Sequence, residues 1–145
     1  MKTLTQIRKI TDQYDACKRE CDGMTNILHF FLNEAGIAHK VYQGNIKNRV
    51  SGAAFEWHMW IELETKQGRA IIDYRARQWL GTMGNTPHGV FLKHDYPHML
   101  YAGSKMEPHK LPKEYILYLV DPVANHRPKE AVDMSAEEAR KHKLI

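Results

Sequence analysis

The sequence predicts an α+β fold in which an N-terminal helix packs on an antiparallel β-sheet. Apolar residues recur with the period of a helix over residues 24–35, and two segments that read as strands follow, joined by a short turn. The chain has 145 residues, of which 43% are hydrophobic and 26% charged. This size and composition are typical of one globular domain, which we expect to span residues 1–145 with a core at about 17–122.

Two helices are expected in the first 36 residues. Leu4, Ile7, Ile10 and Tyr14 recur at three- and four-residue steps, which indicates a short amphipathic helix. The second pattern is stronger. Its apolar positions are Met24, Ile27, Leu28, Phe31, Leu32 and Ala35, and Gly36 stands where a helix commonly ends.

An antiparallel meander is expected next. Residues 38–44 are typical of a strand, and a loop is expected from Gly44 to about Gly52. The segment 55–63 (FEWHMWIEL) alternates, which puts Phe55, Trp57, Met59, Ile61 and Leu63 on one face and Glu56, His58, Trp60 and Glu62 on the other. A turn at 66–68 leads into a returning strand at 69–74.

The pattern weakens after Asp73. Residues 75–80 indicate a helical turn ending at Gly81, and residues 82–113, rich in Gly, Pro, His and Met, are expected to form long loops that wall or cover a site. The apolar run 115–120 (YILYLV) predicts a last strand, and residues 135–143 an exposed helix.

Composition argues against several functional classes. The formal charge of +4 is modest, and no segment gathers base-reading residues, so no nucleic-acid partner is expected. No apolar stretch approaches the ~18 residues of a membrane span, and no signal peptide is evident. Two cysteines four residues apart do not form a secreted disulfide scaffold. A cytoplasmic protein with free thiols is therefore expected.

Cys21, His58 and Asp73 are the candidate catalytic residues. Cys21 begins the strongest helix, where free N–H groups and the helix dipole favour a thiolate and can stabilise an oxyanion. A histidine on a packed strand can accept the thiol proton, and a carboxylate can fix its tautomer. In a hairpin that turns near Thr65, His58 and Asp73 lie opposite or nearly so on one face.

These segments resemble the transglutaminase-like branch of the papain-like cysteine peptidase superfamily. Residues 21–37 (CDGMTNILHFFLNEAGI) are similar to its active-site helix, His58-Met-Trp60 to its His-x-Trp strand, and 71–73 (IID) to its aspartate strand. Residues 73–78 (DYRARQ) resemble the Asp-x-x-x-x-Gln run of some small papain-fold proteins. The resemblance implies a Cys21–His58–Asp73 triad on a papain-like core and covers residues 21 to about 80.

The expected activity is acyl transfer from an amide of a protein or peptide, such as a glutamine side chain or a backbone amide, without a cofactor or metal. Peptidase, glutamine deamidase and transglutaminase chemistry all remain open. For the cleft or the oxyanion site the candidates are Gln13, Trp60 and Gln78.

Three alternatives stay open. Glu20 beside the thiol favours a catalytically silent binding or regulatory module. Cys17 could instead resolve an oxidised Cys21 in a redox sensor, or join it and two histidines in a zinc site, although the Cys-x3-Cys spacing is loose.

Overall fold

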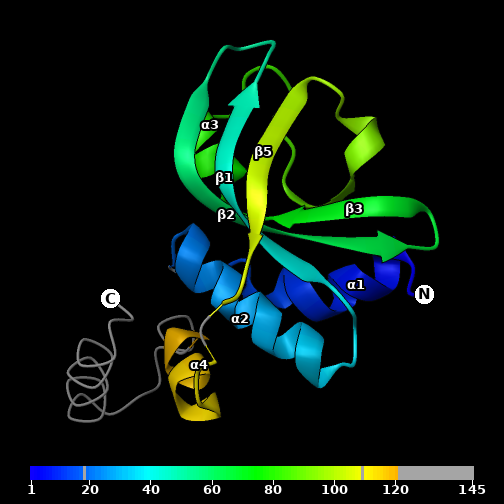
Figure 1. Ribbon diagram of the computed structural model, residues 1–145, viewed down its shortest axis with the longest axis vertical. Helices are drawn as coiled ribbons and strands as arrows, with labels where there is room; N and C mark the ends of the chain where they lie inside the picture. Colours follow the sequence, from blue (N-terminus) through cyan, green and yellow to red (C-terminus); the bar gives the residue numbers. More distant parts are fainter. Residues whose placement is uncertain (18, 109, 121–145) are drawn as a thin grey trace.

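The computed structural model describes residues 1–17, 19–108 and 110–120. In this part of the chain a five-stranded antiparallel sheet, with strand order β4-β3-β2-β1-β5, is combined with four α-helices (Figure 1). The predicted α+β class is therefore confirmed. The elements are α1 (Leu4–Thr11), η1 (Asp12–Tyr14), α2 (Cys21–Glu34), β1 (Lys40–Asn48), β2 (Ala54–Thr65), β3 (Gly68–Asp73), α3 (Ala76–Leu80), β4 (Gly89–Leu92), η2 (Lys93–Asp95), β5 (Met99–Met106) and α4 (Lys113–Val120).

The elements predicted from strong periodicity are confirmed. Thr3 begins α1 with a capping box, in which its side chain and that of Gln6 each accept a hydrogen bond from the other residue's backbone N–H. Helix α2 ends just before Gly36, which adopts the positive φ of 69° that glycine tolerates best. The β2–β3 hairpin turns between Thr65 and Gly68, and α3 ends at Gly81, as predicted.

Three predictions for the rest of the chain are wrong. The expected loop from Gly44 is strand, because β1 continues to Asn48, and the expected loops at 82–113 contain β4 and β5. The expected strand at 115–120 is helix α4, which starts directly after Pro112 and buries Ile116 and Leu119 one turn apart. Periodicity alone cannot distinguish a strand from a helix in so short an apolar run. The helix expected at 135–143 lies outside the described residues.

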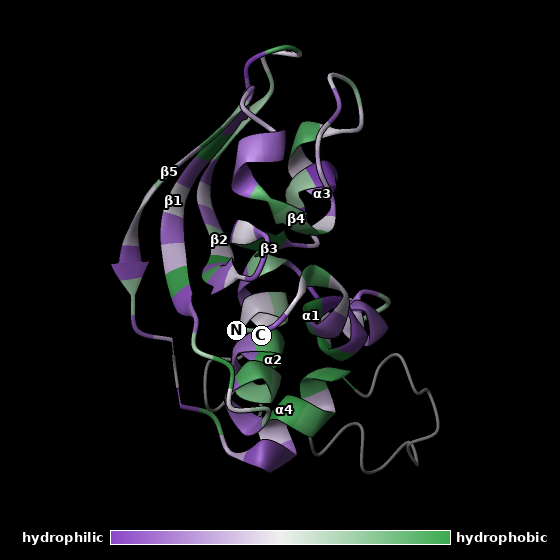
Figure 2. Cartoon of the chain, turned by 90° about the vertical axis from the view of Figure 1, so that its right-hand side faces the viewer, coloured by the Kyte–Doolittle hydropathy of each residue, from purple (hydrophilic) through white to green (hydrophobic). Residues whose placement is uncertain are grey.

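Two hydrophobic clusters lie on opposite faces of the sheet, because their members alternate along β2, β3 and β4. The larger joins the apolar face of α2 to β1, β2, β3 and α4, and it includes Ile27, Leu28, Met59 and Ile61. The smaller surrounds Trp60 and packs α3 against the sheet. In Figure 2 the strands β5, β1 and β2 lie on one side of the molecule, with α3 and α1 on the other. No helix in the described part of the chain is long and apolar enough to cross a membrane.

A β-bulge interrupts β2 directly before His58. Gly44 of β1 pairs with His58 and Ile46 pairs with Phe55, so two residues of β2 face one of β1. Trp57, in the bulge, has a φ of 62° and is 75% exposed. The prediction that Phe55 shares a face with Met59 is wrong, because the bulge interrupts the alternation. Phe55 packs beside the Trp60 cluster and not on the α2 face with Met59. Because the bulge interrupts the alternation just before His58, the direction of the His58 side chain does not follow from the alternation of the residues that precede the bulge.

The backbone of Trp57 is held in a conformation that its side chain disfavours. Asn tolerates positive φ better than Trp, whereas a β-branched residue tolerates it least. We therefore expect Trp57→Asn to raise the free energy of unfolding by up to about 1 kcal/mol and Trp57→Val to lower it. Urea denaturation of both variants beside the wild type measures this difference. A lower stability for Trp57→Asn than for Trp57→Val would contradict the positive-φ bulge.

Candidate active site

Cys21 is the first residue of α2, and the start of this helix has no side-chain cap. The N-cap residue, Glu20, makes no side-chain hydrogen bond to the helix, while Asp22 Oδ1 accepts a hydrogen bond from the N–H of Gly23 at 2.8 Å. The Cys21 side chain is mostly buried, with 9% of the residue exposed. Helix N–H groups that lack a capping side chain can donate to an anion, and the Cys21 sulfur belongs to the first residue at this end of α2.

His58 and Asp73 form a buried pair. His58 Nε2 lies 2.8 Å from Asp73 Oδ2, and the two residues are 0% and 3% exposed. The hairpin pairs Ile61 with Ile72, which makes His58 and Asp73 diagonal neighbours on one face of the sheet. Two further donors hold the carboxylate: the Tyr101 hydroxyl at 2.8 Å from Oδ2 and the Arg75 N–H at 3.0 Å from Oδ1.

The second ring nitrogen of His58 is the one available to the thiol. Asp73 engages Nε2, whereas Nδ1 is buried and has no hydrogen-bond partner among the residues that the structure describes. Burial alone lowers the pKa of His58, but Asp73 outweighs this effect, and with a further contribution from Cys21 the pKa is raised to about 9. Cys21 therefore lies near enough to the imidazole to contribute to its raised pKa. The three residues form one electrostatic unit.

Aromatic rings fix the orientation of the His58 imidazole. The Trp60 ring stacks on it, with centroids 6.3 Å apart, and Phe55 contacts it edge-on at 6.0 Å. Trp60 is itself anchored, since its Nε1 donates to Glu62 Oε2 at 2.8 Å. A ring held in this way has few alternatives to the orientation that joins Asp73 and Cys21.

Arg75 ties the aspartate strand to the segment that leads into α2. Its guanidinium donates to the carbonyl oxygens of Asp15, Cys17 and Arg19 at 2.9, 2.6 and 2.6 Å, and to Asp15 Oδ1 at 2.9 Å. Its backbone N–H donates to Asp73. One residue therefore couples the positions of Asp73 and of the chain just before Cys21.

The predicted cleft residues lie in three different environments. Gln13, in η1, is exposed and donates through Nε2 to the carbonyl of Ile10 at 3.1 Å. Trp60 is buried behind His58, with 1% exposed. Gln78, exposed on α3, lines a groove of about 500 Å³ together with Glu20, the neighbour of Cys21. The lining of this groove includes Cys17 and not Cys21, so Gln78 lies near the segment that leads into α2 without lying at the Cys21 thiol.

Sequence reasoning missed Tyr101 and Arg75. Tyr101 stands in a segment expected to be loop, and its place opposite Asp73 depends on β5 pairing with β1. Arg75 gave no signal beyond its position two residues after Asp73, which is the spacing that lets its N–H reach the carboxylate.

Cys17 lies in a different environment from Cys21. It is buried, burial raises the pKa of its thiol, and its Sγ lies 3.9 Å from the carbonyl oxygen of Val120. Both cysteines are free thiols. Among the residues that the structure describes, no group of three or more His, Cys, Asp and Glu side chains is arranged to hold a metal ion.

Comparison of the chain with models of protein families, with curated proteins and with solved structures found no match. The inference of function therefore depends on the geometry of this site.

The pKa of His58 predicts how stability depends on pH. A histidine whose pKa rises on folding contributes stability that is complete below its unfolded value of about 6.5 and is lost as pH rises through its folded value. Cys21→Ser removes the titration of the thiol and isolates the His58–Asp73 pair. In that variant we expect the free energy of unfolding to fall by at most about 3 kcal/mol between pH 6.5 and 9.

The matched control is the double variant Cys21→Ser/Asp73→Asn, in which the amide keeps the shape but not the charge. Urea denaturation across this pH range should show a weaker dependence in the double variant. Equal slopes in the two proteins would contradict a charged His58–Asp73 pair.

Proposed function

We propose that the protein is a thiol-dependent acyl-transfer enzyme that acts on amide bonds, with Cys21 as nucleophile, His58 as acid and base and Asp73 as the group that orients His58. The observation that carries the proposal is the buried His58–Asp73 pair, whose free Nδ1 is next to the thiol at the start of a helix. A papain-like core of the transglutaminase type is part of the proposal, since a helix that begins with cysteine packs on the strands that carry histidine and aspartate.

The first step follows from these positions. The Cys21 thiolate attacks the carbonyl carbon of an amide, and the carbonyl oxygen gains the negative charge that N–H groups at the start of α2 can stabilise. The tetrahedral intermediate collapses when the carbon–nitrogen bond breaks and protonated His58 gives its proton to the leaving amine. The products are a thioester on Cys21 and a free amine or ammonia.

The second step releases the acyl group. Neutral His58 takes a proton from water or from an acceptor amine, which attacks the thioester and restores the thiolate. Asp73 stays ionised and stabilises the imidazolium each time it forms. The substrate class is a protein or peptide amide, and water or amine as the acceptor gives hydrolysis, deamidation or transglutamination.

A silent binding module is the second candidate, favoured by the acidic residues Glu20 and Asp22 on both sides of the thiol. Negative neighbours oppose a thiolate, so the two candidates differ in the reactivity of Cys21.

Alkylation by iodoacetamide, followed by peptide mass spectrometry, distinguishes them. At pH 6 we expect Cys21 to react at least about tenfold faster than Cys17, because Cys21 stands beside His58 at the start of a helix, whereas burial raises the pKa of the Cys17 thiol. His58→Gln, which keeps a hydrogen-bonding group at this position, should remove the advantage.

His88→Ala is the matched control. His88 also pairs with a carboxylate, with Nε2 2.7 Å from Asp15 Oδ2, but it is not part of the triad. This variant should label like the wild type, and circular dichroism checks that each variant is folded. Labelling of Cys21 that is slow at pH 6, or is unchanged in His58→Gln, would rule out the triad and leave a binding module.

A further inference from the structure

A second concavity lies away from the triad, between the start of α1, the turn after α2 and the β2–β3 hairpin. Its volume is about 600 Å³, within the range of small-molecule sites. The apolar side chains that line it include Ile7, Ile37 and Leu63, which are 0%, 8% and 4% exposed and belong to the larger hydrophobic cluster. The edge of the larger hydrophobic cluster therefore forms an apolar base for the groove, and the 79% exposed side chain of Met1 adds apolar surface that solvent can reach.

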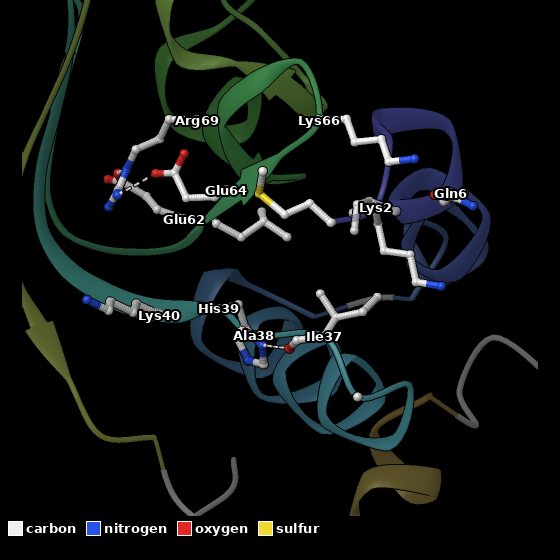
Figure 3. Close-up of a pocket in the computed structure, with 14 residues that line it drawn as sticks. Lys2, Gln6, Ile37, Ala38, His39, Lys40, Glu62, Glu64, Lys66 and Arg69 are labelled. Atoms are coloured by element: carbon white, nitrogen blue, oxygen red, sulfur yellow. Dashed lines mark hydrogen bonds and ion pairs between the residues drawn. The ribbon is translucent and has the colours of Figure 1, made fainter.

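The rim of the groove carries an excess of positive charge. Lys2 and Lys66 lie on the α1 side, and Lys40 and Arg69 on the opposite side (Figure 3). The two carboxylates in the lining are Glu62 and Glu64, and Arg69 engages both of them, at 2.9 and 3.0 Å.

The three lysines make no ion pair with any residue that the structure describes. Their charge is available to a ligand.

Hydrogen bonds hold the walls of the groove in place. The Lys66 N–H donates to the Lys2 carbonyl at 3.0 Å, and the Leu4 N–H donates to Gln67 Oε1 at 3.2 Å, which fastens the hairpin to the start of α1. On the other wall, His39 Nδ1 lies 2.8 Å from the Ile37 carbonyl oxygen. Burial lowers the pKa of His39, so this wall stays neutral at pH 7 and the positive charge is confined to the rim.

We propose that this groove binds a small amphiphilic anion, with its carboxylate head between Lys2 and Lys66 and its apolar chain along the base of the groove. Apolar surface favours the chain through the hydrophobic effect, and the unpaired ammonium groups select a negative head over a neutral or positive one. The site is separate from the triad, and the proposal does not depend on acyl transfer.

Isothermal titration calorimetry of the full chain with decanoate, below its micelle concentration, tests the proposal. We expect one decanoate per chain, weaker binding at higher salt, and little or no binding of acetate, which lacks the chain, or of decyltrimethylammonium, which reverses the charge. Binding of several decanoates per chain, equal binding of the cation, or no binding of decanoate would overturn it.

Variants locate the site. Lys2→Gln/Lys66→Gln should weaken decanoate binding roughly tenfold, as expected for the loss of two exposed charge interactions, while Lys47→Gln/Lys105→Gln removes the same charge outside the groove and should leave the affinity unchanged. Ala38→Asp adds a carboxylate at an exposed position in the lining and should abolish binding without disturbing the core. An equal loss in both double variants would mean that only net charge matters, and unchanged affinity in Ala38→Asp would place the decanoate elsewhere; either result would overturn the assignment.

Discussion

The arrangement of the site depends on the buried ion pair between His58 and Asp73. Removing two charges from water costs several kcal/mol per ion, so such a pair persists only where further hydrogen bonds satisfy the carboxylate. Tyr101 and the Arg75 backbone supply these bonds here. The donors come from strand β5, which is joined to the β2–β3 hairpin through β1, and from the residue just before α3, so β1 and β5 must be in place to hold the pair.

Other parts of the structure also restrict the positions of His58 and Asp73. The bulge at Trp57 directs the His58 side chain, and Trp60 restricts its ring. Glycines make this packing possible: a Cβ on Gly103 would lie 2.7 Å from the Trp60 ring and 2.4 Å from a β1 carbonyl oxygen, so β5 can approach only without one. Arg75 then fixes the segment before Cys21 relative to Asp73. The bulge, the packing around Trp60 and the hydrogen bonds of Arg75 thus all contribute to the positions of Cys21, His58 and Asp73.

Local signals allowed about half of the fold to be predicted, and the catalytic roles of Cys21, His58 and Asp73 stay a prediction. Helix α2 and the β2–β3 hairpin have periodic patterns that do not depend on distant contacts, and the hairpin alone brings His58 near Asp73. Helix α4 and strand β5 could not be predicted, because a short apolar run suits either structure and an edge strand needs its partner. The roles of Tyr101 and Arg75 depend on tertiary contacts that leave no sequence pattern.

The most direct test of the central claim is nitrogen-15 NMR of the His58 imidazole in the intact protein. The structure predicts an imidazolium at pH 7.5, with both ring nitrogens protonated and a titration near pH 9. Asp73→Asn should shift that titration to lower pH. A neutral His58 ring at pH 7.5 in the wild type would contradict the charged pair and, with it, the proposed activation of Cys21.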